Sequence, residues 1–176
     1  SDIKIVAMRG NIDTRIRKLK NKEFDAIVLS LAGIQMLNLG NEVKEVFAID
    51  QMLPAIGQGA IALQCKKNDK KILNILQRVN DKETYYCIKA ERALLEAIGG
   101  DCDTAIGGLA KISNEKIFLK SELFSDDGKK KFEAQNSGYF QEAEDIGYKV
   151  GKELLEKAGS EFTSQESWKC ILLLQD

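Results

Sequence analysis

The sequence contains no histidine, and this absence removes several kinds of chemistry. Without an imidazole the chain cannot use a histidine as general acid or base, build a Ser-His or Cys-His pair, or bind a metal through histidine. No C-x-x-C spacing occurs among its four cysteines, so the usual zinc and redox signatures are missing too. We expect no metal centre, and any catalysis must use carboxylates, Lys, Arg, Tyr, a cofactor or backbone dipoles.

A strong charge bias and a long apolar run are also missing. The 26 basic and 27 acidic residues leave a net charge of −1, so we expect no nucleic-acid partner, and any anion site must be local. The apolar run at residues 171–174 is far shorter than the ~20 residues that span a bilayer, so we expect no membrane partner. No secretory signal peptide is visible, and unpaired cysteines suit a reducing compartment, so we expect a cytoplasmic location.

The 176 residues are 44% hydrophobic and 30% charged, which is typical of a globular protein with one domain or two small ones. In the first 59 residues, short apolar runs alternate with segments of helical period. This pattern predicts βαβ units with a buried parallel sheet, that is, part of an α/β domain resembling the periplasmic-binding-protein type. The expected strands are residues 3–8, 25–30 and 45–49, and the expected helices are residues 12–19 and 31–39.

The rest of the chain predicts a linking segment and then a small α+β domain. Residues 60–99 hold an expected return strand at 60–65 and helices at 70–79 and 82–98, on the second of which Lys89, Glu91 and Arg92 suggest a solvated face. From residue 100 to 176 we expect a three-stranded antiparallel sheet covered by one helix. Its expected strands are residues 106–112, 116–124 and 131–135, and its helix is residues 141–158.

Two arginines stand where the first expected strand runs into the first helix. Arg9 precedes the turn and Arg15 lies in the first turns of the helix. Ligands in open α/β sheets bind beyond the carboxyl ends of strands, and the planar guanidinium matches a carboxylate or phosphate. The pair therefore suggests an anion site, although for the pattern alone ordinary surface arginines are the commoner explanation.

Two loops carry further candidate residues. The segment LPAIGQGA at residues 53–60 offers backbone N–H groups and the amide of Gln58, and as a pattern alone it is a tight loop. Cys102 follows a glycine pair that ends a helix, and it lies between Asp101 and Asp103. Two adjacent carboxylates disfavour a thiolate, which argues against a repeatedly reacting nucleophile and leaves room for a bond formed once.

These segments together resemble the porphobilinogen deaminase (hydroxymethylbilane synthase) family. Residues 8–15 (MRGNIDTR) are similar to its RGN-x-x-TR segment, and residues 53–60 match its LPAIGQGA loop closely. Ala32-Gly33 before residues 37–40 (LNLG) resembles its AGL…LGL segment. The run AERALL, followed by GGDC and IGG, is similar to its cofactor loop.

The resemblance implies an enzyme of tetrapyrrole (heme) biosynthesis. The family joins four porphobilinogen molecules into hydroxymethylbilane on a dipyrromethane primer held by a loop cysteine, and its full-length members are expected to be monomeric. By motif match, Cys102 would carry the dipyrromethane covalently. Arg9 and Arg15 would bind its carboxylates, and Gln58 and Ser30 would line the cofactor cleft.

Three departures limit this interpretation. Met36 stands where the family often has arginine, and Asp101 and Ala105 replace residues of the usual loop. The family's catalytic aspartate belongs to an amino-terminal part that this chain lacks, so we expect the isolated fragment to hold no catalytic residue and to be inactive. The alternative from another class is a non-catalytic binding or structural α/β module, which would self-associate through its orphaned surface.

Overall fold

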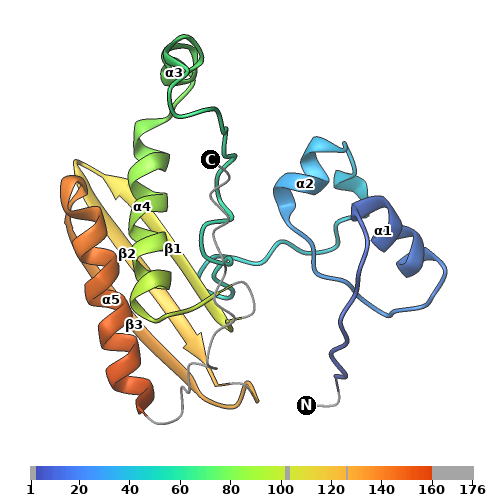
Figure 1. The fold of residues 1–176 in the computed structure, drawn as a ribbon. Helices are drawn as coiled ribbons and strands as arrows, with labels where there is room; N and C mark the ends of the chain where they lie inside the picture. Colours follow the sequence, from blue (N-terminus) through green and yellow to red (C-terminus); the bar gives the residue numbers. More distant parts are fainter. Residues whose placement is uncertain (1–2, 102–103, 126, 160–176) are drawn as a thin grey trace. The chain divides into compact units, whose positions relative to one another are not determined.

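The computed structural model describes residues 3–101, 104–125 and 127–159. The chain divides into two compact units, Ser1–Ala48 and Ile49–Asp176. Each unit is described by itself below, and Figure 1 shows the elements along the chain.

The first unit contains two short helices. Helix α1 (Ile12–Lys20) begins at Asn11, whose side-chain oxygen accepts a hydrogen bond from the Thr14 amide at 2.9 Å. Helix α2 (Leu31–Met36) is followed by the 3₁₀ turn η1 (Gly40–Glu42). The helices confirm the 3.6-residue period seen in the sequence, although α2 ends three residues earlier than expected.

The prediction of four strands in the first 65 residues was wrong. Among the described residues, no sheet includes residues 3–8, 25–30, 45–49 or 60–65. A strand exists only through hydrogen bonds to a neighbouring strand, and these segments have no such neighbour. Their large apolar side chains are consequently exposed, as for Ile5 (92%) and Ile61 (85%).

The second unit contains the antiparallel sheet that the sequence predicts. Strands β1 (Ile106–Ser113), β2 (Lys116–Phe124) and β3 (Lys131–Tyr139) lie in the order β1-β2-β3. Asn114 and Glu115 join β1 to β2 with positive φ angles of 50° and 61°, the conformation of a two-residue hairpin turn whose twist matches the strands. Strand β3 runs four residues further than expected, since it pairs with the whole length of β2.

Two helices cover one face of this sheet (Figure 1). They are α4 (Lys82–Ala97) and α5 (Ala143–Ala158), with the 3₁₀ turn η2 (Phe140–Glu142) before α5 and helix α3 (Lys70–Gln77) before α4. Alternate residues of β2 point into the layer between helices and sheet, which is the core of the unit. The core includes Leu94, Ile117, Leu119, Leu123, Val150 and Leu154, each at most 1% exposed.

The two helices cross at small residues. A Cβ atom at Gly147 of α5 would lie 2.8 Å from the Cβ of Ala93 and would meet the carbonyl oxygen of Ala90 on α4. One turn later, a Cβ at Gly151 would lie 2.9 Å from the carbonyl oxygen of Leu94. These glycines therefore let the two backbones approach each other directly.

The packing places α4 with the sheet. Helix α4 shares its buried residues with β1, β2 and α5, and the compact units divide at residue 48. The domain divisions expected after residues 59 and 99 stay predictions. Among the helices that the structure describes, none is long and apolar enough to cross a membrane.

Candidate functional site

The start of α1 carries both predicted arginines, Arg9 in the turn before the helix and Arg15 within the helix itself. Arg9 is exposed and makes no hydrogen bond or ion pair with any described residue, whereas Arg15 is half-buried. The Nε of Arg15 donates to the carbonyl oxygen of Gly10 at 2.7 Å, which ties the guanidinium to the residue that follows Arg9. The terminal nitrogens of both side chains remain as donors for an anion at the start of a helix, where the helix dipole also favours negative charge.

Gly10 makes this turn possible. Its φ of 126° lies in a region that L side chains rarely adopt, and an added Cβ would lie 2.9 Å from Cγ2 of Thr14. The turn therefore specifies glycine for two independent reasons, strain and space.

Ser30 is the N-cap residue of α2, as Asn11 is of α1. Its hydroxyl oxygen caps the helix, accepting from the amide of Gly33 at 3.4 Å, and the side chain is exposed. Ser30 and the two arginines thus lie at the starts of the two helices in the first unit. Met36, which replaces a family arginine, is the last residue of α2 and is 77% exposed.

In the second unit, residues 53–60 lie along the free edge of β1. Ala55 forms an antiparallel bridge with Gly107, and the amide of Gly108 donates to the carbonyl oxygen of Pro54 at 2.9 Å. A Cβ at Gly107 would lie 3.0 Å from the Cβ of Leu53 and 3.2 Å from its carbonyl oxygen. The glycines of β1 therefore allow the loop to dock against the strand edge.

Glu91 holds this loop from the side of α4, and here the sequence interpretation was wrong. Instead of belonging to a solvated face, Glu91 is 4% exposed. Its Oε2 accepts from the Gly57 amide at 2.8 Å, and its Oε1 accepts from the Ala110 amide of β1 at 3.0 Å. One carboxylate thus joins the loop, the strand edge and the helix.

Burial raises the pKa of Glu91 above its ordinary value, while the hydrogen bonds from Ala110 and Gly57 act in the opposite direction. The nearby Cys87 thiol, one turn earlier on α4, has a raised pKa because of burial first and the Glu91 charge second. The three charged residues that the sequence grouped on one face of α4 therefore have different environments. Glu91 is buried, Nζ of Lys89 forms an ion pair with Glu144 at 3.0 Å, and Arg92 is exposed.

Gln58 remains exposed in the loop that the two hydrogen bonds of Glu91 hold against β1, an arrangement called the Glu91 clamp below. Its backbone amide donates to the Ala55 carbonyl at 3.3 Å, and Gly57 before it has a φ of 71°. Cys102, the predicted attachment residue, lies outside the described residues. On either side of it, Gly99 ends α4 with a φ of 63°, and the Asp101 amide donates to Oγ1 of Thr104 at 2.9 Å.

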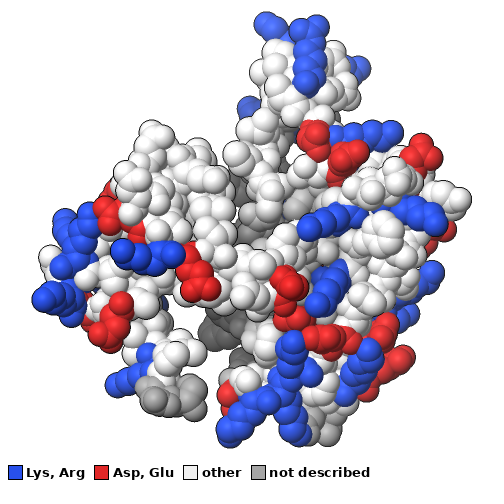
Figure 2. Space-filling view, turned by 180° about the vertical axis from the view of Figure 1, so that it is seen from behind, with Lys and Arg blue, Asp and Glu red and all other residues white. Residues whose placement is uncertain are grey.

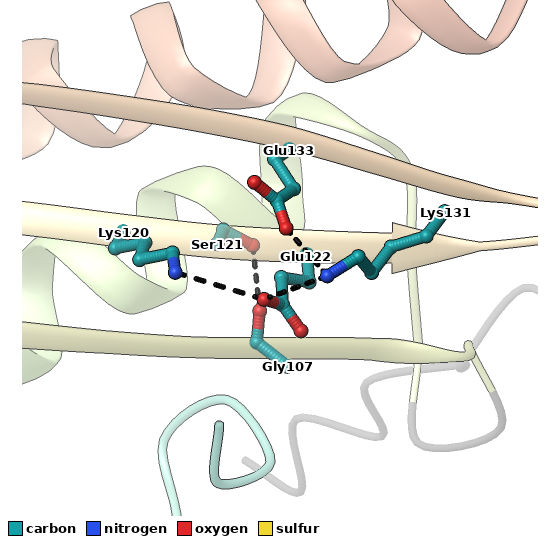
Figure 3. A network of polar contacts seen from close by, with 6 residues as sticks. All are labelled: Gly107, Lys120, Ser121, Glu122, Lys131 and Glu133. Atoms are coloured by element: carbon teal, nitrogen blue, oxygen red, sulfur yellow. Dashed lines mark hydrogen bonds and ion pairs between the residues drawn. The ribbon is translucent and has the colours of Figure 1, made fainter. Parts of the chain in front are cut away.

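The face of the sheet opposite the helices carries a separate polar network (Figure 3). Glu122, 8% exposed, lies 3.4 Å from Nζ of Lys131 and 3.7 Å from Nζ of Lys120. Lys131 also pairs with Glu133 on the same strand. Figure 2 shows basic and acidic side chains interspersed on the face seen from behind, so the described surface there presents mixed charge.

A hollow of about 590 Å³ adjoins this network, but it contains none of the predicted site residues. It is lined in part by Ile49, Leu53, Leu109 and Phe118, with Lys111 and Lys120 at its polar side. Among the described residues, no group of three or more His, Cys, Asp or Glu is placed to hold a metal ion.

Comparison with known proteins gives two family matches in sequence order. Residues 1–74 match the family model described as "Porphobilinogen deaminase, dipyromethane cofactor binding domain", and residues 85–156 match "Porphobilinogen deaminase, C-terminal domain". The second match includes most of α4, in agreement with the packing of this helix on the sheet.

Individual relatives agree with these matches. The chain is 36% identical over 161 residues to a porphobilinogen deaminase of Nitrobacter hamburgensis, covering 92% of this chain and 51% of that protein. It is 40% identical over 156 residues to one of Coxiella burnetii, covering 89% and 51%. The chain therefore spans about half the length of the curated relatives it matches, and by both family matches it belongs to the porphobilinogen deaminase family.

Proposed function

We propose that the chain is the carboxy-terminal portion of a porphobilinogen deaminase, a cytoplasmic transferase that joins four porphobilinogen molecules into hydroxymethylbilane and releases ammonia. One observation carries the proposal: two arginine side chains lie at one helix start, inside the segment that matches the family's cofactor-binding domain. An enzyme whose substrate and primer both bear carboxylates needs such donors.

The donor set fits a dipyrromethane with acetate and propionate side chains. Arg15 is oriented through its Nε bond to Gly10, so its terminal nitrogens keep the fork geometry that binds a carboxylate. Arg9, which has no partner among the described residues, would bind a second carboxylate. The N-terminus of α1 adds a favourable dipole for the same negative charge.

Two further residues would orient the cofactor. Gln58 offers an amide donor and acceptor on the loop that Glu91 holds against β1. Ser30 uses its hydroxyl oxygen as a helix cap, so its hydrogen is available to donate. Both roles follow from the family motif together with the exposure of the side chains.

Cys102 would hold the dipyrromethane through a thioether. Its acidic neighbours, Asp101 and Asp103, disfavour a free thiolate, which suits a bond that is made once and kept. When bound, the dipyrromethane supplies the pyrrole carbon to which porphobilinogen is added. The residues of this chain would bind and orient carboxylates, while a general acid would come from outside it, so the chain alone should be inactive.

A covalent hybrid tests the proposal. The portion of the Coxiella burnetii relative that does not align with this chain is joined to it in one polypeptide, and bilane formation from porphobilinogen is followed by chromatography. We expect the hybrid to form bilane and the 176-residue chain alone to form none.

The matched variants are Cys102→Ala and Cys87→Ala in the same hybrid. The first should abolish bilane formation and the second should retain it, because Cys87 is half-buried on α4 and belongs to none of the segments that match the family's motifs. A hybrid that folds cooperatively but forms no bilane would contradict the proposal and favour the non-catalytic module.

A further inference from the structure

The sheet face opposite α4 and α5 holds an apolar area. Leu109 of β1 and Phe118 of β2 point away from the helices, because side chains alternate along a strand and their neighbours Ala110 and Leu119 are buried in the core. Phe118 is 49% exposed. The face turned away from the core is ordinarily polar in an antiparallel sheet, so an apolar area on it is a candidate binding surface.

Two side chains from the segment before the Gln58 loop turn this area into a hollow. Ile49 and Leu53 line the hollow of about 590 Å³ together with Leu109 and Phe118. All of them belong to the second unit. The volume lies within the range of small-molecule sites, and Ile49 is still 45% exposed, so apolar surface remains for a ligand to cover.

Two lysines flank the apolar floor. The strand register places Lys111 directly opposite Phe118, and Lys120 directly opposite Leu109. Side chains that face each other in this way have Cβ atoms about 4.5–5.5 Å apart, so each lysine starts beside an apolar side chain. The lysines therefore occupy two opposite corners of a four-residue patch whose other corners are apolar.

The charge of this patch is incompletely neutralised. Lys111 forms no ion pair with another residue that the structure describes, and Nζ of Lys120 lies 3.7 Å from Glu122. Glu122 lies closer to Lys131, at 3.4 Å, and Lys131 also pairs with Glu133 (Figure 3). Lys131 thus engages both carboxylates of the network, which leaves positive charge at the Lys111 side of the hollow.

We propose that this hollow binds a planar aromatic molecule that carries two carboxylates. Its ring lies on Phe118 and Leu109, where offset packing of two aromatic rings adds to the burial of apolar surface. One carboxylate pairs with Lys111 and the other with Lys120. The strand register supplies this alternation of flat apolar surface and ammonium groups.

Other ligands fit the hollow less well. Two separate ammonium groups favour two carboxylates over one, and a half-exposed phenyl ring favours a flat aromatic body over an alkyl chain. Gln135 and Ser137 of β3 also line the hollow, and they offer neutral hydrogen-bonding groups that can orient a carboxylate. A nucleic acid is disfavoured, because Glu122 and Glu133 adjoin the lysines and would repel its phosphates.

Titration of the 176-residue chain with naphthalene-2,6-dicarboxylate tests the inference. We expect saturable chemical-shift changes at the backbone amides of residues 109–111 and 118–120. The dissociation constant should be about 0.1–1 mM, as for a ligand of this size in an open site. Nuclear Overhauser effects between the naphthalene protons and the side chains of Phe118 and Leu109 should place the ring directly on the floor.

Matched variants and a second probe separate the contacts. Lys111→Gln should raise the dissociation constant about three- to fivefold, the effect of losing one exposed ion pair. Lys149→Gln, an exposed residue of α5 on the other side of the sheet, should leave it unchanged. Naphthalene-2-carboxylate should bind more weakly than the dicarboxylate by a similar factor. Circular dichroism of each variant verifies that the helices and the sheet are retained.

Three results would overturn the inference. These are no saturable change at the named amides well above the expected dissociation constant, equal binding by Lys111→Gln and the native chain, or equal binding of the two probes. The inference does not use Cys102, Arg9 or Arg15, so it fails or stands independently of the proposed function. A hybrid that forms no bilane contradicts only the latter.

Discussion

The Glu91 carboxylate accepts a hydrogen bond from the Gly57 amide at 2.8 Å, across 34 residues of sequence. Its other oxygen accepts from Ala110 at the edge of β1. This contact fixes the loop that carries Gln58, and it satisfies an edge N–H that would otherwise be buried without a partner.

Replacing Glu91 with glutamine should destabilise the second unit. The glutamine keeps the shape but turns an NH₂ group toward one of the two amides, leaving that amide without an acceptor. We expect the free energy of unfolding to fall by about 2 kcal/mol, the usual cost of an unpaired buried donor. Urea denaturation followed by circular dichroism measures it. Glu83→Gln, an exposed residue in the first turn of the same helix, is the matched control and should change stability by only a few tenths of a kcal/mol; equal losses would contradict the clamp.

The raised pKa of Glu91 predicts a pH dependence of definite sign. Because burial raises the folded-state pKa above the ordinary 4.5, the folded chain binds a proton more tightly than the unfolded chain. The stability contributed by this group is therefore complete below pH 4.5 and is lost as pH rises through the raised value. The free-energy difference between the native chain and Glu91→Gln should shrink from acid pH toward neutrality, and a difference that grows with pH would show that the pKa is lowered instead.

The crossing of α4 and α5 should not tolerate a methyl group at Gly147. The added Cβ would meet the Ala90 carbonyl and lie 2.9 Å from the Leu94 amide nitrogen, both backbone atoms that cannot move aside. We expect Gly147→Ala to lower the free energy of unfolding by about 3 kcal/mol, as for severe overpacking. Gly59→Ala, where no atom lies within 4 Å, is the control, and a thermal denaturation midpoint that falls equally in both variants would refute the close crossing.

Arg15 should matter for substrate and primer binding in the active hybrid. Loss of a charge-assisted pair to a carboxylate costs roughly 1.5–3 kcal/mol, so Arg15→Gln should lower kcat/KM by about tenfold to a hundredfold. Arg17→Gln changes an exposed residue two positions along the same helix and should have little effect. If steady-state kinetics show the two variants to be alike, the guanidinium of Arg15 does not bind substrate or primer.

The sequence predicts helices and hairpins well here because both are decided by nearby residues. Helix α1 and strand β2 appear at or within one residue of the expected bounds. The segments at residues 3–8 and 25–30 fail as strands for the opposite reason, because a parallel strand depends on neighbours far away in sequence. Their apolar composition indicates strands, while the described chain offers them no ladder to join.

In the candidate site, too, the sequence predicts the positions that depend on nearby residues and misses those that depend on residues far away in sequence. Local motifs place Arg9, Arg15 and Ser30 at helix starts, and the structure agrees that they lie there. Glu91 was missed because its partners, Gly57 and Ala110, are far from it in sequence. A signal was present, since Glu91 adjoins the apolar stripe of α4 and sits next to Ala90, which is fully buried.

The intact mass of the covalent hybrid tests the central claim most directly, because it reports the cofactor bond without depending on turnover. We predict an added mass of two linked pyrrole units on the hybrid, present in Cys87→Ala and absent from Cys102→Ala. An unmodified mass in a folded hybrid, or an addition that survives Cys102→Ala, would contradict the account.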